Sequence, residues 1–514
     1  MGSEVFRSAA DRRPLLPFFR VFLDRIENLN IPFYRLIAFV LVLISIREGL
    51  EQIFFEKPFE LYLYYHHAFF FLASLAAGIL MLSLWARTDA RRTARVVAAG
   101  YFMIIVPPLI DRLAFHRTVP YEYARPDEFL RNVLAYFRNA PGTGIGILIE
   151  ITAILFFSFI YILIKTRSPG RAIGGALTLY LLVAFIGTPR LFLPLPRMNN
   201  PEVYNARHIL YFSVYLLAFL GLSLVALFLY ARSLLRAAVR DMLSFRSAHF
   251  LIMVSTGLYF NSRIRLYPFP GGLYAFVALL IMLFLWTITV LLNNAHDLSI
   301  DRIANPGRPL ALGWATPAGY LGLGYTLAVL ALFTSGVLGA KDFLITAAFL
   351  LSAYPYSVPP FRLRLRLGSN LIIGWGSFLA FYLGYHAWTT IKEFPLEPKP
   401  VLVSIIILSA LSLGSFTKDG KDYEGDLASG VRTVFTVYGP EKGGRIASVG
   451  LFLSLLTPLL LLHGLADIVF FPVVAVLTAF LFEKKRRLIV PFAGYTIIAI
   501  YAFLRTIGLF GGWI

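Results

Sequence analysis

Apolar runs of about twenty residues recur along almost the whole chain, and this is the length that an α-helix needs to cross a bilayer. Hydrophobic residues make up 58% of the 514 residues, whereas charged residues make up only 15%. By the length criterion, roughly six spans precede residue 235 and roughly nine follow it. The sequence therefore predicts an all-α polytopic membrane protein.

The expected spans fall into two groups, which are separated by a basic stretch from Arg232 to Arg246. They lie near residues 31–46, 67–85, 94–110, 143–164, 172–189, 209–230, 248–262, 271–292, 317–337, 342–354, 369–389, 400–416, 444–462, 465–482 and 488–506. We expect two domains, an amino-terminal transmembrane bundle over residues 1–235 and a second bundle over residues 236–514. The residue patterns that indicate a chemical function are concentrated in the second bundle.

The net charge of +19 does not indicate nucleic-acid binding, because the basic residues fall in short runs between apolar segments. These runs follow alternate spans, and basic residues accumulate in cytoplasmic loops. The amino terminus and the basic loops are therefore expected in the cytoplasm and the carboxyl terminus outside. The loops expected on the opposite side of the membrane are acidic or carry charges of both signs, and one of them contains Glu48, Glu51 and Glu56.

An acidic segment, NNAHDLSIDRIANPGRPL (residues 293–310), follows one span on the side of the basic runs. Asn293, Asp297 and Asp301 are four residues apart, so they share one face if the preceding helix continues past the membrane. Charges at a helix end are common near the membrane interface and need no function. We nevertheless favour a functional role for this segment, because polar and acidic residues recur at the same four-residue spacing in a second segment.

The second acidic segment, FTKDGKDYEGDLASGVRT (residues 416–433), carries Lys418, Asp422 and Asp426 at the same spacing. In an overlay of the two segments, Asn294 coincides with Asp419, Asp297 with Asp422 and Asp301 with Asp426, and an arginine follows downstream in each segment, Arg308 and Arg432. An even number of expected spans lies between the segments. This arrangement predicts two related halves whose cytoplasmic exits face one cavity.

Facing carboxylates attract Mg²⁺, a hard cation that binds one or two carboxylates and fills its other positions with water and phosphate oxygens. The candidate metal ligands are Asn294, Asp297, Asp301, Asp419, Asp422 and Asp426. The expected ligand is a polyphosphate, which Lys418, Arg308 and Arg362 are placed to hold. Because the sequence has no cysteine, disulfides, thiolate metal sites and cysteine nucleophiles are excluded.

Three segments are similar to motifs of the UbiA superfamily of intramembrane prenyltransferases. NNAHDLSIDRIANPGRP resembles its first aspartate-rich motif, KDGKDYEGD its second, and YPYSVPPFRLRLR (residues 354–366) its Tyr-Ser-x-Pro-Pro-x-Arg loop. The motifs occur in the family's order, each at a cytoplasmic span exit, and the resemblance covers about residues 240–514. One departure is Asn294, which stands where the family usually has its first aspartate.

The resemblance implies a nine-helix prenyltransferase bundle that takes a prenyl diphosphate from the bilayer. Mg²⁺ would bridge the diphosphate and the aspartates while the carbon–oxygen bond ionises to an allylic cation. The prenyl group would then pass to a lipid-soluble or aromatic acceptor associated with the membrane. The expected catalytic residues are Asp297, Asp301, Asp422, Asp426 and Lys418. The expected diphosphate-binding residues are Asn293, Arg308, Arg362, Lys418 and Tyr356.

Several alternatives stay open. Quinone precursors, chlorin or haem side chains, glycerol-phosphate lipids and sugar phosphates are all candidate acceptors. A polytopic transporter is favoured by the number of spans, but the sequence lacks the interrupted helices and intramembrane charge pairs typical of that class. A catalytically inert relative is suggested only by Asn294, whose missing charge would weaken the first metal site.

The amino-terminal bundle shows no chemistry of comparable specificity, and we expect it to bind the acceptor, to carry a protein partner or to act as a scaffold. His66 and His67 are adjacent, so they point in different directions from a helix and a joint metal site is disfavoured. Glu150 lies inside an apolar run, where an ionisable group is usually paired or functional. In the second bundle, the glycines of IIGWGSFLAFYLGYH (residues 372–386) favour close helix packing over the lining of a tunnel.

Overall fold

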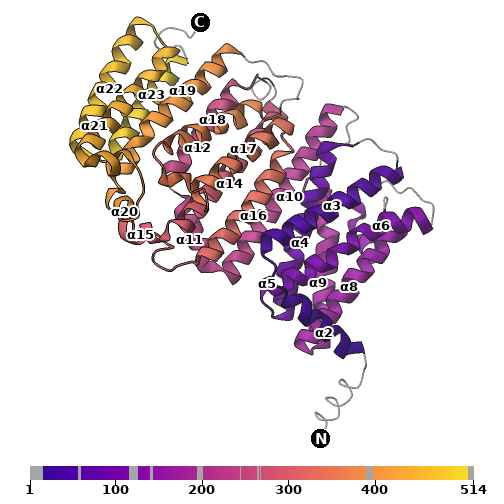
Figure 1. Cartoon of the computed structure of the whole chain (residues 1–514). Helices are drawn as coiled ribbons and strands as arrows, with labels where there is room; N and C mark the ends of the chain where they lie inside the picture. Colours follow the sequence, from indigo (N-terminus) through magenta and orange to yellow (C-terminus); the bar gives the residue numbers. More distant parts are fainter. Residues whose placement is uncertain are drawn as a thin grey trace. The chain divides into compact units, whose positions relative to one another are not determined.

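The computed structural model consists of helices and connecting turns in all of the residues that it describes (Figure 1). These are residues 15–55, 59–114, 126–138, 140, 143–193, 201–243, 245–262, 266, 268–388 and 397–506. Within this part of the chain, ten helices are long and apolar enough to cross a membrane, and two shorter apolar helices accompany them. The expectation of an all-helical, multi-pass membrane protein is confirmed.

The chain divides into two compact units, residues 1–235 and 236–514. The main helices of the first unit are α2 (Leu15–Glu27), α3 (Phe33–Phe55), α4 (Leu61–Ala86), α5 (Ala90–Gly100), α8 (Ile145–Thr166), α9 (Pro169–Ile186) and α10 (Pro201–Tyr230). Helix α4 is the central one, because it packs against α10, α9, α5 and α8 and buries most of its length.

The first unit differs from the sequence expectation at one point. Glu48 and Glu51 were expected in a loop, but both lie inside α3, where Glu48 is buried. The charged residues at the end of that apolar run therefore extend the helix rather than terminate it. Glu56, the third acidic residue of the expected loop, lies outside the described residues.

The second unit begins within α11 (Arg232–Met242). Its longer helices are α12 (Phe245–Phe260), α14 (Pro268–His296), α16 (Pro317–Ser335), α17 (Ala340–Ser357), α18 (Asn370–His386), α19 (Pro398–Gly414), α21 (Val434–Leu456), α22 (Leu465–Lys485) and α23 (Ile489–Thr506). Two short helices, α15 (Leu298–Ala304) and α20 (Tyr423–Ala428), carry the acidic segments. They follow α14 and α19 respectively, at the ends of two spans.

Glycines on α18 allow this helix to approach its neighbours closely, as the sequence predicts. A Cβ atom at Gly374 would collide with the carbonyl oxygen of Leu408 on α19. One at Gly384 would collide with the carbonyl oxygen of Val254 on α12. A Cβ atom at Gly376 would meet only ordinary contacts, and this glycine lines a cavity. Close helix packing therefore explains Gly374 and Gly384, whereas Gly376 contributes to the wall of the cavity.

Candidate active site

The two acidic segments have the same local conformation. Asp297 is the N-cap of α15 with φ −99° and ψ 12°, and Asp422 is the N-cap of α20 with φ −94° and ψ 8°. In each segment the backbone N–H of the aspartate four residues later, Asp301 or Asp426, donates to the N-cap carbonyl at 2.9 Å. The expected continuous helix is therefore broken at the first aspartate, but the spacing of one turn is preserved.

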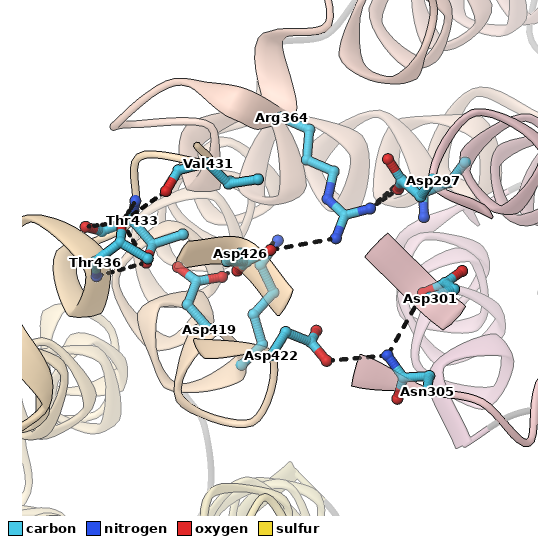
Figure 2. Close-up of polar contacts among 12 residues, drawn as sticks. Asp297, Asp301, Asn305, Arg364, Asp419, Asp422, Asp426, Val431, Thr433 and Thr436 are labelled. Carbon is cyan, nitrogen blue, oxygen red and sulfur yellow. Dashed lines mark hydrogen bonds and ion pairs between the residues drawn. The ribbon is translucent and has the colours of Figure 1, made fainter. Parts of the chain in front are cut away.

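Helices α15 and α20 pack directly against each other and bring the two segments together. A Cβ atom at Gly425 would lie 2.7 Å from the Cβ atom of Ala304, so only glycine permits this approach. Asn305 links the carboxylates across the contact, because its Nδ2 lies 3.2 Å from Asp422 Oδ1 and 3.5 Å from Asp301 Oδ1 (Figure 2).

Arg364 lies between the aspartates of the two segments, as Figure 2 shows. It forms an ion pair with Asp297, and its Nη2 lies 3.8 Å from Asp426 Oδ1. Arg362, two residues earlier, donates from Nη2 to Asp297 Oδ1 at 3.0 Å. The side chains of Asp297 and Asp426 are 2% and 4% exposed, so these arginines neutralise carboxylates that are almost fully removed from water.

The loop that carries these arginines is tied to the second acidic segment. The N–H of Arg432 donates to the carbonyl oxygen of Leu365 at 3.0 Å. Directly after it, Thr433 and Thr436 form a capping box at the start of α21. The side chain of Arg432 is exposed, whereas Arg308 contacts its own acidic segment, so the downstream arginines of the two segments have different surroundings.

The expected diphosphate-binding lysine is held by a tyrosine from α17. Lys418 Nζ donates to the hydroxyl of Tyr356 at 3.0 Å and lies 4.0 Å from Asp419 Oδ1. Tyr356 and Lys418 were predicted from separate motifs, and both line the same cavity.

The amide of Asn294 is engaged on both sides. Its Oδ1 accepts a hydrogen bond from Arg308 Nη1 at 2.9 Å, and its Nδ2 donates to Asp241 Oδ2 at 2.9 Å. Arg308 Nη1 also lies 2.6 Å from Asp301 Oδ2. Asn294 is only 5% exposed, which contradicts the interpretation of this position as a solvated helix end.

Burial disfavours the charged form of two of these carboxylates. It raises the pKa of Asp426 to about 6, an effect that Arg364 opposes and the neighbouring Asp422 and Asp419 reinforce. Burial likewise raises the pKa of Asp301, against the opposing effect of Arg308. A cation bound among these carboxylates would favour their ionised form and so oppose the effect of burial.

A cavity of about 1060 Å³ opens among these residues. Its polar lining includes Asn293, Asn294, Arg308, Tyr356, Arg364, Lys418, Asp419, Asp422 and Asp426. Its apolar lining includes Phe250, Trp286 and Phe349, with the rings of Phe250 and Trp286 5.1 Å apart. Cavities that take drug-sized molecules span roughly 300 to 1000 Å³, so this one suits a larger, amphiphilic ligand.

The donor set fits Mg²⁺, which prefers hard oxygen ligands. Carboxylates from both acidic segments meet at α15 and α20, where the buried oxygens Asp297 Oδ2 and Asp426 Oδ1 both face the guanidinium of Arg364. The predicted residues that line the cavity are Asn293, Asn294, Arg308, Tyr356, Lys418, Asp419, Asp422 and Asp426. Asp297, Asp301 and Arg362 are not among its lining residues, although Asp297 pairs with Arg364 and Asp301 with Arg308, which are. The roles of all of these residues as ligands stay a prediction. Sequence reasoning missed Arg364, Asn305 and Asp241, although Arg364 lies within a quoted motif.

A second polar cluster lies in the first unit, among α3, α4 and α8. His67 Nδ1 lies 2.8 Å from Glu48 Oε1, and the ligand atoms of Glu48, Glu51 and His67 lie within 4.8 Å of one another. Glu150 lies 3.4 Å from Arg47, so this intramembrane acid is paired. His66 instead contacts His208 on α10, at 3.0 Å between their Nδ1 atoms, which agrees with the divergent directions expected for adjacent histidines.

Comparison with known proteins gives a family match for the second unit. The sequence profile of the UbiA prenyltransferase family matches residues 250–506. Digeranylgeranylglyceryl phosphate synthase of Metallosphaera sedula is 28% identical over 177 residues, which are 34% of this chain and 60% of the relative. The bacteriochlorophyll synthase 33 kDa chain of Rhodobacter capsulatus is 29% identical over 164 residues, which are 30% of this chain and 52% of the relative. The chain thus matches little more than half the length of these relatives.

Two solved structures also resemble the chain. One, of digeranylgeranylglyceryl phosphate synthase, has 19% sequence identity and a TM-score of 0.39, and the match covers 53% of this chain and 95% of that one. The other is a UbiA homologue from Archaeoglobus fulgidus bound to DMAPP and Mg²⁺, with 18% identity and a TM-score of 0.35, covering 54% and 88% of the two chains.

Proposed function

This chain belongs to the UbiA prenyltransferase family, and we propose that its second unit transfers a prenyl group from a prenyl diphosphate to an acceptor in the membrane. The observation that carries the proposal is that α15 and α20 bring two aspartate segments together beside a cavity that Arg308, Arg364 and Lys418 line. A diphosphate would be repelled by the aspartates alone, so the arrangement calls for bound cations as well as arginine and lysine. Mg²⁺ is the proposed cofactor.

Several of the polar residues have a proposed task. Lys418, Arg308 and Arg362 hold the diphosphate oxygens, and Tyr356 orients Lys418 through its hydroxyl. Asp297 and Asp422, at the N-caps of matching helices, are the metal-binding carboxylates together with the aspartates one turn later. When bound, Mg²⁺ supplies positive charge that stabilises the departing diphosphate.

The apolar lining of the cavity is proposed to hold the prenyl tail. Burial of each methylene would contribute about 0.8 kcal/mol, so a long chain is favoured over a short one. The rings of Phe250, Trp286 and Phe349 can stabilise a developing positive charge and exclude water from it. Basic runs beside the acidic segments favour a cytoplasmic location for the polar end of the cavity.

The acceptor is proposed to be lipid-soluble or aromatic, and the two similar relatives named above indicate which acceptors to test first. The full chain in lipid nanodiscs would be incubated with a deuterated prenyl diphosphate, Mg²⁺ and one acceptor at a time, including a glycerol-phosphate lipid and a chlorin. Mass spectrometry should find a lipid product that has gained the deuterated prenyl group, and EDTA should abolish it. Unprenylated acceptors throughout, with the prenyl diphosphate recovered intact, would contradict the proposal.

A further inference from the structure

Asp241 is an acidic residue of the cavity that belongs to none of the three motifs. It lies near the end of α11, lines the same cavity as the aspartate segments, and is partly exposed there. Its Oδ2 accepts hydrogen bonds from Asn294 Nδ2 at 2.9 Å and from the hydroxyl of Tyr320 at 2.8 Å. Tyr320 is fully buried on α16, so it holds the carboxylate in a defined position.

Asn294, which takes the place of the first aspartate of the motif, connects Asp241 to the first acidic segment. Its amide lies between Asp241 on one side and Arg308 on the other, and Arg308 in turn pairs with Asp301. An amide can offer an oxygen to a cation, but it carries no negative charge. The neighbouring carboxylate therefore restores a charge beside the position where the motif lacks one.

The two hydrogen bonds to Asp241 fall on the same oxygen. Among the residues that the structure describes, none donates a hydrogen bond to its other oxygen, Oδ1. The carboxylate thus keeps an acceptor oxygen for a ligand of the cavity while Asn294 and Tyr320 fix its orientation. This is the arrangement expected of a metal-binding carboxylate with its supporting groups.

We propose that Asp241 is a further metal-binding residue, which supplies to the first metal site the negative charge that Asn294 does not. The proposal rests on the proposed function, because it assigns Asp241 to the same Mg²⁺–diphosphate site. Asn294 is then a positioning residue that donates to Asp241 and accepts from Arg308. It follows that the departure at Asn294 is compensated from α11 and is no sign of an inert protein.

The proposal reverses the effect expected for Asn294→Asp from sequence alone. A motif with one missing acid should bind Mg²⁺ more tightly once the acid is restored. In the structure, an aspartate at this position would lose the hydrogen bond to Asp241 and place two carboxylates beside each other. We therefore expect Asn294→Asp not to tighten metal binding, unless Asp241 is changed as well.

The decisive variant exchanges the two groups. In Asp241→Asn/Asn294→Asp the carboxylate and the amide trade places, and the hydrogen bond between them can form with its direction reversed. Binding of Mn²⁺, as a spectroscopic substitute for Mg²⁺, would be measured by electron paramagnetic resonance on the full chain in nanodiscs. Asp241→Asn should weaken Mn²⁺ binding by about tenfold or more, a typical effect of one lost charge contact at a partly exposed site. The exchanged variant should recover most of that loss.

Glu424→Gln is the matched control, because it removes an exposed carboxylate of α20, the helix that carries Asp426. It should bind Mn²⁺ like the wild type, and thermal unfolding of every variant would show that the fold persists. Unchanged Mn²⁺ binding by Asp241→Asn, or an exchanged variant no better than Asp241→Asn, overturns the proposal for Asp241 alone. A wild-type chain that neither binds Mn²⁺ nor consumes prenyl diphosphate would instead overturn the proposed function.

Discussion

Arg47→Met should destabilise the amino-terminal unit by about 3 to 5 kcal/mol, the usual cost of leaving a buried charge without its partner. Arg47 Nε lies 2.9 Å from Glu51 Oε1, and its Nη1 lies 3.4 Å from Glu150 Oε2. The same Nη1 donates to the carbonyl oxygen of Ile104 at 3.0 Å. One guanidinium thus joins α3, α8 and the short helix η1 (Tyr101–Ile105).

The magnitude follows from the burial of these groups. The side chains of Arg47, Glu51 and Glu150 are 7%, 11% and 12% exposed. At an effective dielectric constant of 20, each ion pair attracts by roughly 5 to 6 kcal/mol before the cost of desolvation is subtracted. Because desolvation of the arginine cancels part of this attraction, the net loss on its removal falls to the range given above.

The assay is equilibrium unfolding of the full chain in mixed micelles, with SDS as the denaturant and brief proteolysis to report the unfolded fraction of each unit. Arg35→Met is the matched control, since Arg35 is exposed on the same helix and its loss should change stability by about 0.5 kcal/mol at most. Arg47→Met combined with Glu51→Gln and Glu150→Gln should recover much of the lost stability, because no buried carboxylate is then left unpaired. Equal midpoints for Arg47→Met and Arg35→Met would refute the reasoning.

Two further changes address the catalytic unit. Arg364→Met leaves Asp297 and Asp426 without the cation between them, and repulsion by their charges should weaken prenyl diphosphate binding by about tenfold or more. Arg366→Met, exposed in the same loop, should bind normally in the same calorimetric titration, and equal losses would show that only the charge of the loop matters. Gly425→Ala should separate α15 from α20 and cost about 1 to 3 kcal/mol in SDS unfolding. Gly322→Ala, which meets open space, should be neutral, and a neutral Gly425→Ala would contradict the close contact.

Much of the catalytic unit is predictable because its signals are local in sequence. Apolar runs mark the helices, and the spacing of Asp297 and Asp301, repeated at Asp422 and Asp426, indicates two matching turns. The structure adds what spacing cannot provide. Arg362 and Arg364 lie two residues apart in one loop, so the sequence does not distinguish their roles. The structure shows that Arg364 is the one that contacts aspartates of both acidic segments.

Other features have no local signal. Asp241 lies in a basic amphipathic helix, where a single acid is usually a solvated partner of its neighbours, and its role depends on contacts with α14 and α16. In the first unit, charged residues interrupt the apolar run that contains Glu48, so the sequence favours a loop. The helix can continue because its acids are paired inside the bundle. Glu48 pairs with His67 of α4, and Glu51 pairs with Arg47 of the same helix.

The central claim is that the paired aspartate segments activate a prenyl diphosphate with Mg²⁺. The measurement that tests it most directly is diphosphate release by the full chain in nanodiscs, at saturating Mg²⁺ and acceptor, for the wild type, Asp422→Ala and Glu424→Gln. We predict release by the wild type and by Glu424→Gln, and a loss of at least about a hundredfold in Asp422→Ala, in the range of lost electrostatic stabilisation. Near-normal release by Asp422→Ala would contradict the account.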